Sequence, residues 1–220
     1  MARKNWFVIA ILILYLCFLG SDRILGFFDN TSQLSQMMDN EKLEYYKNEY
    51  EKMSNILEVE ADDYEVIYSK VVLREIYQFY DEITIGKGTS DGIQEGDLVV
   101  NENGVVGVIK DARNTSSVVR LLTSPDMELS VKINGSYGIL TSVDKTLIVK
   151  NIKLDSEIKE GDLVYTSGLT SIPGDILVGE VSKVNRDSLE LEYLLDVDSI
   201  THQRDISYVA VLHREKSEVS

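Results

Sequence analysis

The chain has 220 residues and a formal net charge of -15, which leaves room for one medium-sized domain or two small ones. Aspartate and glutamate outnumber lysine and arginine by 37 to 22, which argues against nucleic acid as a partner because binding a polyanion requires clustered cations. One cysteine cannot form an internal disulfide, and two histidines are too few for a metal centre of His and Cys ligands. We therefore expect no metal and no cofactor.

Glycine and proline, the residues that break helices, are unevenly distributed along the chain. Twelve of the 14 glycines and both prolines lie between Gly86 and Gly179, and neither type occurs between Phe27 and Ile85. The interval from Asp39 to Glu65 contains ten carboxylates and only three lysines. This distribution predicts three regions: an apolar N-terminus, an acidic helical stalk and a β-rich body.

The apolar N-terminus is predicted to be a membrane anchor over residues 1–28. An uninterrupted apolar run, Trp6 to Leu19, would form a helix of roughly 21 Å at ~1.5 Å per residue, which is shorter than a ~30 Å bilayer core unless the helix continues to Phe28. No pair of small residues with signal-peptidase spacing follows the run, so we expect an uncleaved anchor. Cys17 lies inside the run, where packing in the membrane is a better interpretation than lipidation.

The charges that flank this run predict its orientation. Arg3 and Lys4 precede the run, whereas Asp22, Arg23 and Asp29 follow it. By the positive-inside rule, the short N-terminus is cytoplasmic and the body after about Phe28 lies outside the cytoplasm.

The acidic stalk, residues 29–63, has the pattern of a short coiled coil. Apolar side chains recur at alternating intervals of three and four residues, and charged residues flank them. An amphipathic helix lying on its own domain has the same period, so this alternative stays open. The predicted seam, through which two copies would dimerise, consists of Leu43, Tyr46, Tyr50, Met53 and Leu57.

The body contains an internal repeat. QEGDLVV at residues 94–100 returns as KEGDLVY at residues 159–165, and VVGVIKDARN at 105–114 resembles LVGEVSKVNRD at 177–187. Both copies lead into segments with β character, so two tandem copies of one β unit explain the pattern best. We interpret each Gly-Asp pair as a tight turn into a strand.

The predicted fold is mainly β with an N-terminal helix, and the body forms two small β-barrels. Met127 to Ile133 alternates apolar and polar residues as a half-buried strand does, and Asn134-Gly135 is a hairpin turn sequence. Many short strands separated by such turns are typical of barrels. The expected boundaries are 64–150 for the first barrel, 151–212 for the second and 213–220 for a flexible tail.

Two other classes of protein also have paired barrels. A trypsin-like hydrolase needs a serine, a base and an orienting acid, but Ser167 lacks the usual Gly-Asp-Ser-Gly context, His202 falls in a polar turn and His213 in the expected tail. A membrane-fusion adaptor inserts a two-helix hairpin between β halves, whereas the single helix here precedes the whole β body. Residue context therefore disfavours the hydrolase, and the order of the helix and the β body disfavours the adaptor.

Four stretches of the body resemble the rod shape-determining protein MreC family and occur in the same order as in that family. These are DEITIGKGTSDGIQEGDLVV (81–100), GVVGVI (104–109), SSVVRLLTSPD (116–126) and GDLVYTSGLTSIPGDILVGEV (161–181). The resemblance extends from the anchor to about Val184. One departure is Ser-Ile-Pro-Gly at 171–174, where the family commonly has Phe-Pro-Pro-Gly.

The resemblance implies a non-enzymatic, single-pass membrane protein that dimerises through its coiled coil and organises peptidoglycan synthesis for cell wall elongation and rod cell shape. It also implies MreD, a class B penicillin-binding transpeptidase and RodA as partners, with cytoplasmic MreB as an indirect partner.

Overall fold

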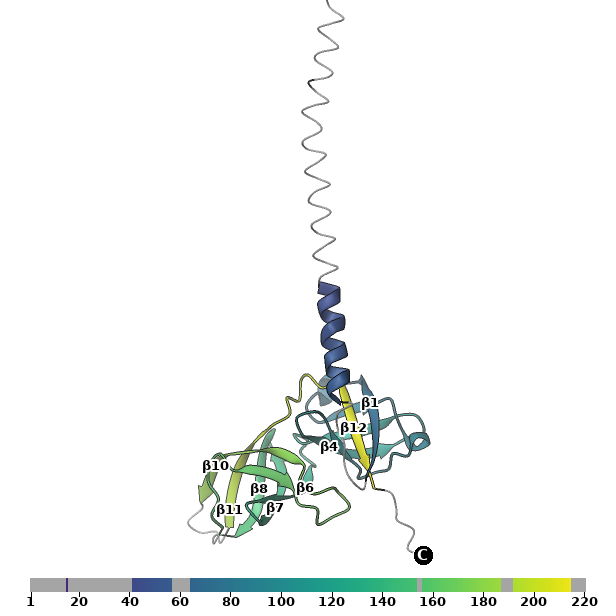
Figure 1. Cartoon of the computed structure of the whole chain (residues 1–220). Helices are drawn as coiled ribbons and strands as arrows, with labels where there is room; N and C mark the ends of the chain where they lie inside the picture. The colour runs from purple at the N-terminus through teal and green to yellow at the C-terminus, as the bar shows by residue number, and fades with distance from the viewer. Residues whose placement is uncertain (1–14, 16–40, 57–63, 154–155, 187–191, 215–220) are drawn as a thin grey trace, which may run out of the picture. The chain divides into compact units, whose positions relative to one another are not determined.

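The structure is a computed structural model that describes residues 15, 41–56, 64–153, 156–186 and 192–214 (Figure 1). The chain divides into two compact units, residues 1–51 and 52–220. Residues 41–56 are helical, as expected for the stalk. The predicted anchor lies outside the described residues apart from Tyr15, and no described helix has the length and apolar character needed to cross a membrane.

The body consists of short strands and two 3-10 turns. In chain order these are β1 (Glu65–Leu73), η1 (Ile76–Gln78), β2 (Glu82–Ile85), η2 (Thr89–Asp91), β3 (Leu98–Val100), β4 (Val105–Ala112), β5 (Ser117–Leu121), β6 (Glu128–Ile133), β7 (Ser136–Val143), β8 (Thr146–Lys153), β9 (Leu163–Thr166), β10 (Leu177–Arg186), β11 (Glu192–Ser199) and β12 (Tyr208–His213).

The strands close into two antiparallel barrels, which confirms the predicted mainly β fold with two barrels. The first has the strand order β1-β12-β3-β4-β5-β2, and the second has the order β10-β11-β8-β7-β6-β9. Closure leaves neither sheet with a free edge, so all of these strands have two hydrogen-bonded neighbours.

The first barrel is a circular permutation of the second. Six consecutive strands, β6 to β11, form the second barrel, whereas the first takes its sixth strand from the C-terminal β12. Placing β12 before β1 gives both barrels the same neighbour order. The β12–β1 pair ends at His213 opposite Glu65, just as the β6–β7 pair ends at Ile133 opposite Ser136, where the Asn134-Gly135 turn joins the strands.

This topology differs from the expected boundaries. The expected division at residue 150 falls inside β8, and the second barrel instead runs from β6 to β11. The flexible tail was expected to begin at residue 213, but His213 is the last residue of β12, so this expected boundary lies one residue too early. Sequence pattern could not reveal this arrangement because β12 is apolar on both faces and pairs with a strand from the other end of the body.

The two copies of the repeat adopt the same turn. The carboxylate of Asp97 accepts a hydrogen bond from the Gln94 N–H at 2.7 Å, and that of Asp162 accepts one from the Lys159 N–H at 2.9 Å. In each copy the preceding glycine has positive φ, and its N–H donates to a carbonyl at 2.9 Å, Gly96 to Ile109 of β4 and Gly161 to Val181 of β10. The Gly-Asp pairs therefore close tight turns into β3 and β9.

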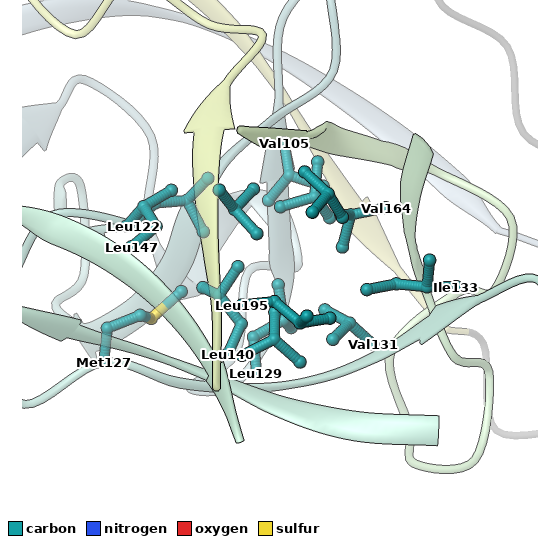
Figure 2. Close-up of a cluster of buried hydrophobic side chains, with 14 of the residues drawn as sticks. Val105, Leu122, Met127, Leu129, Val131, Ile133, Leu140, Leu147, Val164 and Leu195 are labelled. Carbon is teal, nitrogen blue, oxygen red and sulfur yellow. The ribbon is translucent and has the colours of Figure 1, made fainter. Parts of the chain in front are cut away.

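The barrels are joined by buried side chains. Val105, at the start of β4, belongs to the same buried cluster as Val164 and Leu122 (Figure 2). A Cβ on Gly104 would lie 2.3 Å from the Leu177 carbonyl oxygen, so only glycine permits this approach of the β3–β4 turn to the second barrel. The Thr201 hydroxyl adds a hydrogen bond to the Val105 carbonyl at 3.0 Å.

Candidate interaction surfaces

Four of the five predicted seam residues lie on the described helix. Leu43, Tyr46, Tyr50 and Met53 are all exposed, and Leu57 lies outside the described residues. Ile56, which is not in the seam, is only 2% exposed and belongs to the buried cluster of the body. The exposed side chains form a stripe at helical spacing, the arrangement through which a second helix packs.

The second barrel has an apolar outer face, which we call the β7 face. Along β7, Gly138 and Leu140 are buried, so Tyr137, Ile139 and Val143 alternate with them and are exposed. Neighbouring strands extend this surface. The β7 face consists of Tyr137, Ile139, Val143, Ile148, Leu163 and Tyr165.

Two lysines lie within the β7 face, although the chain as a whole is acidic. Lys132 is in register with Tyr137 on one side and Tyr165 on the other, and Lys150 is in register with Ile139. The Lys132 ammonium forms an ion pair with Asp175 at 2.6 Å, and this carboxylate is largely exposed. Such a surface is suited to a partner that presents apolar side chains together with carboxylates.

A second apolar patch lies on the first barrel, at the end of β1 and in η1. Its side chains Val72, Leu73, Ile76 and Tyr77 are exposed, and Tyr77 is 98% exposed. Nearby, the Arg74 guanidinium stacks over the Phe79 ring at 4.5 Å from its centroid. Sequence analysis did not identify either apolar surface.

One sequence signal could have revealed the β7 face. The segment SYGILTSV of β7 has large apolar residues at both odd and even positions, and a half-buried strand does not need them on its outer side. The patch around η1 has no comparable signal, because Ile76 and Tyr77 resemble any two apolar residues after a strand.

The residues considered for catalysis do not come together. Within the described residues, the buried Ser167 hydroxyl pairs with the Ser130 hydroxyl at 2.9 Å and accepts a hydrogen bond from the Leu169 N–H at 3.1 Å. His213 instead contacts the Asp97 carboxylate at 3.0 Å. Each group therefore holds a local turn or strand end.

We found no cluster of three His, Cys, Asp or Glu side chains in the described part of the chain that could hold a metal ion. Glu180 on β10 is in register with Asp198 on β11, and neither of these two strands carries a residue of the β7 face.

Comparison with known proteins identifies the family. A sequence model of the rod shape-determining protein MreC, barrel core, matches residues 71–213. The chain belongs to the MreC family of rod shape-determining proteins. The match runs through β12 and so extends beyond Val184, where the resemblance in the sequence had ended.

Individual MreC proteins agree with this assignment. The cell shape-determining protein MreC of Listeria monocytogenes is 31% identical over 161 residues, which cover 69% of this chain and 55% of the relative. The Bacillus subtilis protein of the same description is 31% identical over 171 residues, covering 70% of this chain and 58% of the relative. The chain thus spans a little over half the length of these MreC proteins.

Solved MreC structures share the fold. The Listeria monocytogenes MreC structure superposes with a TM-score of 0.67 at 28% identity, covering 84% of this chain and 92% of that one. A chain from the complex between penicillin-binding protein PBP2 and MreC of Helicobacter pylori gives a TM-score of 0.56 at 19% identity, covering 67% of this chain and 99% of that one.

Proposed function

We propose that this chain is a non-enzymatic, membrane-anchored scaffold that positions cell-wall synthases during elongation. Its membership in a family of cell shape-determining proteins supports this function, and the apolar run from Trp6 to Leu19 supports a single-pass anchor. The body would then lie outside the cytoplasm, on the side of the membrane where the wall is assembled.

The observation that carries the proposal is the apolar β7 face of the second barrel. Exposed apolar side chains are costly in water, and where several gather on one side of a domain they often mark a binding site. The complex of Helicobacter pylori MreC with PBP2 supports a class B penicillin-binding transpeptidase as the partner of this chain. MreD and RodA, and MreB indirectly, remain partners implied by the family.

The docking role of the β7 face can be tested with Ile139→Asp. A carboxylate in the middle of this face should weaken crosslinking of the full chain to the class B transpeptidase in membranes at least tenfold, because central apolar residues dominate interface energetics. Ser182→Asp on β10 is a matched control, since it adds the same charge at an exposed position. Equal crosslinking of the two variants would exclude the β7 face as the docking site.

We also propose that the helical stalk dimerises the scaffold through the seam. Tyr50→Lys combined with Met53→Lys places charges in the seam and should shift a chain beginning at Thr31 toward monomer in sedimentation experiments, by at least tenfold in the dimer dissociation constant. Asn48→Lys with Asn55→Lys adds the same two charges on the opposite side of the helix and should leave the dimer intact. A dimer unaffected by the seam substitutions would place the contact elsewhere.

A further inference from the structure

The sequence contains two Asn-Gly pairs, Asn103-Gly104 and Asn134-Gly135. In such a pair the glycine nitrogen can attack the asparagine side chain, because glycine has no Cβ to block a close approach. Both pairs lie in turns between consecutive strands, the first between β3 and β4 and the second between β6 and β7. The two turns differ in how firmly the rest of the molecule holds them.

The β3–β4 turn is held by hydrogen bonds and by packing. Asn101 Oδ1 accepts from the Asn103 N–H at 3.0 Å and from the Gly104 N–H at 3.1 Å, and the Asn101 N–H donates to the Gly104 carbonyl at 2.9 Å. Gly104 is buried, and a Cβ there would lie 2.3 Å from the Leu177 carbonyl oxygen. The Gly104 nitrogen is therefore occupied, and freeing it requires the junction between the barrels to open.

The β6–β7 turn is open to solvent. Asn134 and Gly135 are both exposed, and nothing lies within 4 Å of a Cβ built on Gly135. The Gly135 N–H donates to no group of the described residues. The φ angles are 49° and 82°, as in a two-residue turn of type I′. Attack by the glycine nitrogen requires the turn to open, and an exposed hairpin tip opens at lower cost than a buried junction.

The Asn134 side chain contacts the turn of the second repeat copy. Its Nδ2 donates to Asp162 Oδ2 at 2.8 Å, and the same oxygen accepts from the Lys159 N–H at 2.9 Å. Asp162 belongs to the Gly-Asp pair that leads into β9. Loss of the amide nitrogen of Asn134 would therefore act directly on this turn.

We propose that Asn134 is a site of spontaneous deamidation and that the product weakens the second barrel. The Gly135 nitrogen forms a bond to Asn134 Cγ, the Cγ–Nδ2 bond breaks, and ammonia leaves with the proton that the Gly135 nitrogen loses. Water then opens the succinimide ring, adding its hydroxyl to one of the two ring carbonyl carbons and its proton to the nitrogen, which gives aspartate or isoaspartate. Water is the only co-reactant, and the proposal does not depend on the scaffold role.

Both products disturb the structure around the turn. An aspartate at position 134 places a carboxylate oxygen where Nδ2 now donates to Asp162, and two carboxylates at this distance repel each other. Isoaspartate adds a methylene group to the backbone of a two-residue turn, which then no longer matches the pairing of Ile133 with Ser136. The disturbed end of the hairpin adjoins Tyr137 of the β7 face.

Ageing of the full chain in detergent, followed by peptide mapping with mass spectrometry, tests the site. In mildly alkaline buffer we expect Asn134 to deamidate at least about tenfold faster than Asn103, because one turn opens alone and the other opens only with the barrel junction. In urea the two rates should converge, since only the shared Asn-Gly sequence then matters. Equal rates in the folded chain would overturn the proposal, and so would a difference that persists in urea.

Three variants test the effect on the barrel. Asn134→Asp reproduces one product and should lower the urea midpoint of unfolding by about 0.5 M or more. Asn103→Asp adds the same charge at an exposed asparagine whose side chain forms no hydrogen bond with the described residues, and it should leave the midpoint unchanged. Asn134→Asp combined with Asp162→Asn reverses the pair, so that the amide at position 162 donates to the carboxylate at position 134, and should restore the midpoint.

The stability measurements can contradict the proposed effect in two ways. Asn134→Asp may prove no less stable than Asn103→Asp, in which case the product does not weaken the barrel. If the double variant is no more stable than Asn134→Asp alone, repulsion from Asp162 is not the cause of the loss.

Discussion

Ending the chain at Asp205 should unfold the first barrel and leave the second folded. The truncation removes Ile206 and all of β12, whose residues Val209, Val211 and Leu212 are almost fully buried. At ~1.5 to 3 kcal/mol for each of these four side chains, the loss is about 6 to 12 kcal/mol, which is as large as the whole stability of a typical domain. Thermal unfolding followed by near-ultraviolet circular dichroism would detect the lost tertiary structure.

A control truncation and a rescue variant test whether the loss of β12 itself causes the unfolding. Ending the chain at Arg214 retains β12 and should unfold like the full-length protein. In the chain truncated at Asp205, placing residues 206–213 before Glu65 with an Asn-Gly linker should restore the barrel, because the linker reproduces the hairpin between Ile133 and Ser136. A truncated chain that still unfolds at the original temperature would contradict the role of β12 in closing the barrel.

Gly107→Ala and Gly179→Ala should each destabilise their own barrel by at least about 3 kcal/mol. These glycines occupy matching positions in the two copies of the repeat, in β4 and β10. A Cβ at Gly107 would lie 2.0 Å from the Arg120 carbonyl oxygen, and one at Gly179 would lie 2.2 Å from that of Asp198. Because both obstacles are backbone atoms of the paired strand, they can move away only if the ladder opens.

Urea denaturation is the appropriate measurement, with Gly96→Ala as the control. Gly96 has positive φ, but nothing lies within 4 Å of a Cβ there, so this substitution should cost only about 1 to 2 kcal/mol of backbone strain. If Gly107→Ala were as mild as Gly96→Ala, the close strand approach would not limit the barrel.

The sequence was sufficient to predict the features that depend on local chemistry. The Gly-Asp turns and the Asn134-Gly135 hairpin follow from residues that tolerate positive φ, and the repeat revealed two barrels because it copies such turns. The pairing of β12 with β1 depends on contacts between distant segments, and no local pattern encodes them. The hydrolase alternative was already weak from residue context, but only the fold shows that Ser167 pairs with Ser130 and His213 with Asp97.

The interaction surfaces were harder to predict than the fold. Apolar residues on one side of a helix recur every three or four positions in the sequence, so the seam could be proposed from the spacing of its residues. The β7 face combines residues from β7, β8 and β9 that strand register brings together. Within β7 the sequence carries a signal, but the contribution of the neighbouring strands has none, because register and not sequence order places them beside β7.

The permuted first barrel also sets the order in which the body can fold while the ribosome is still working. β1 to β5 are synthesised first, but β12 can pair with them only after the ribosome has added the 92 residues from Leu121 to His213. At about 5 to 20 residues per second, that interval lasts roughly 5 to 20 s, during which the edges of β1 and β3 lack their partner. The second barrel, synthesised later, closes first, so it can give the nascent first barrel a folded neighbour on which to assemble.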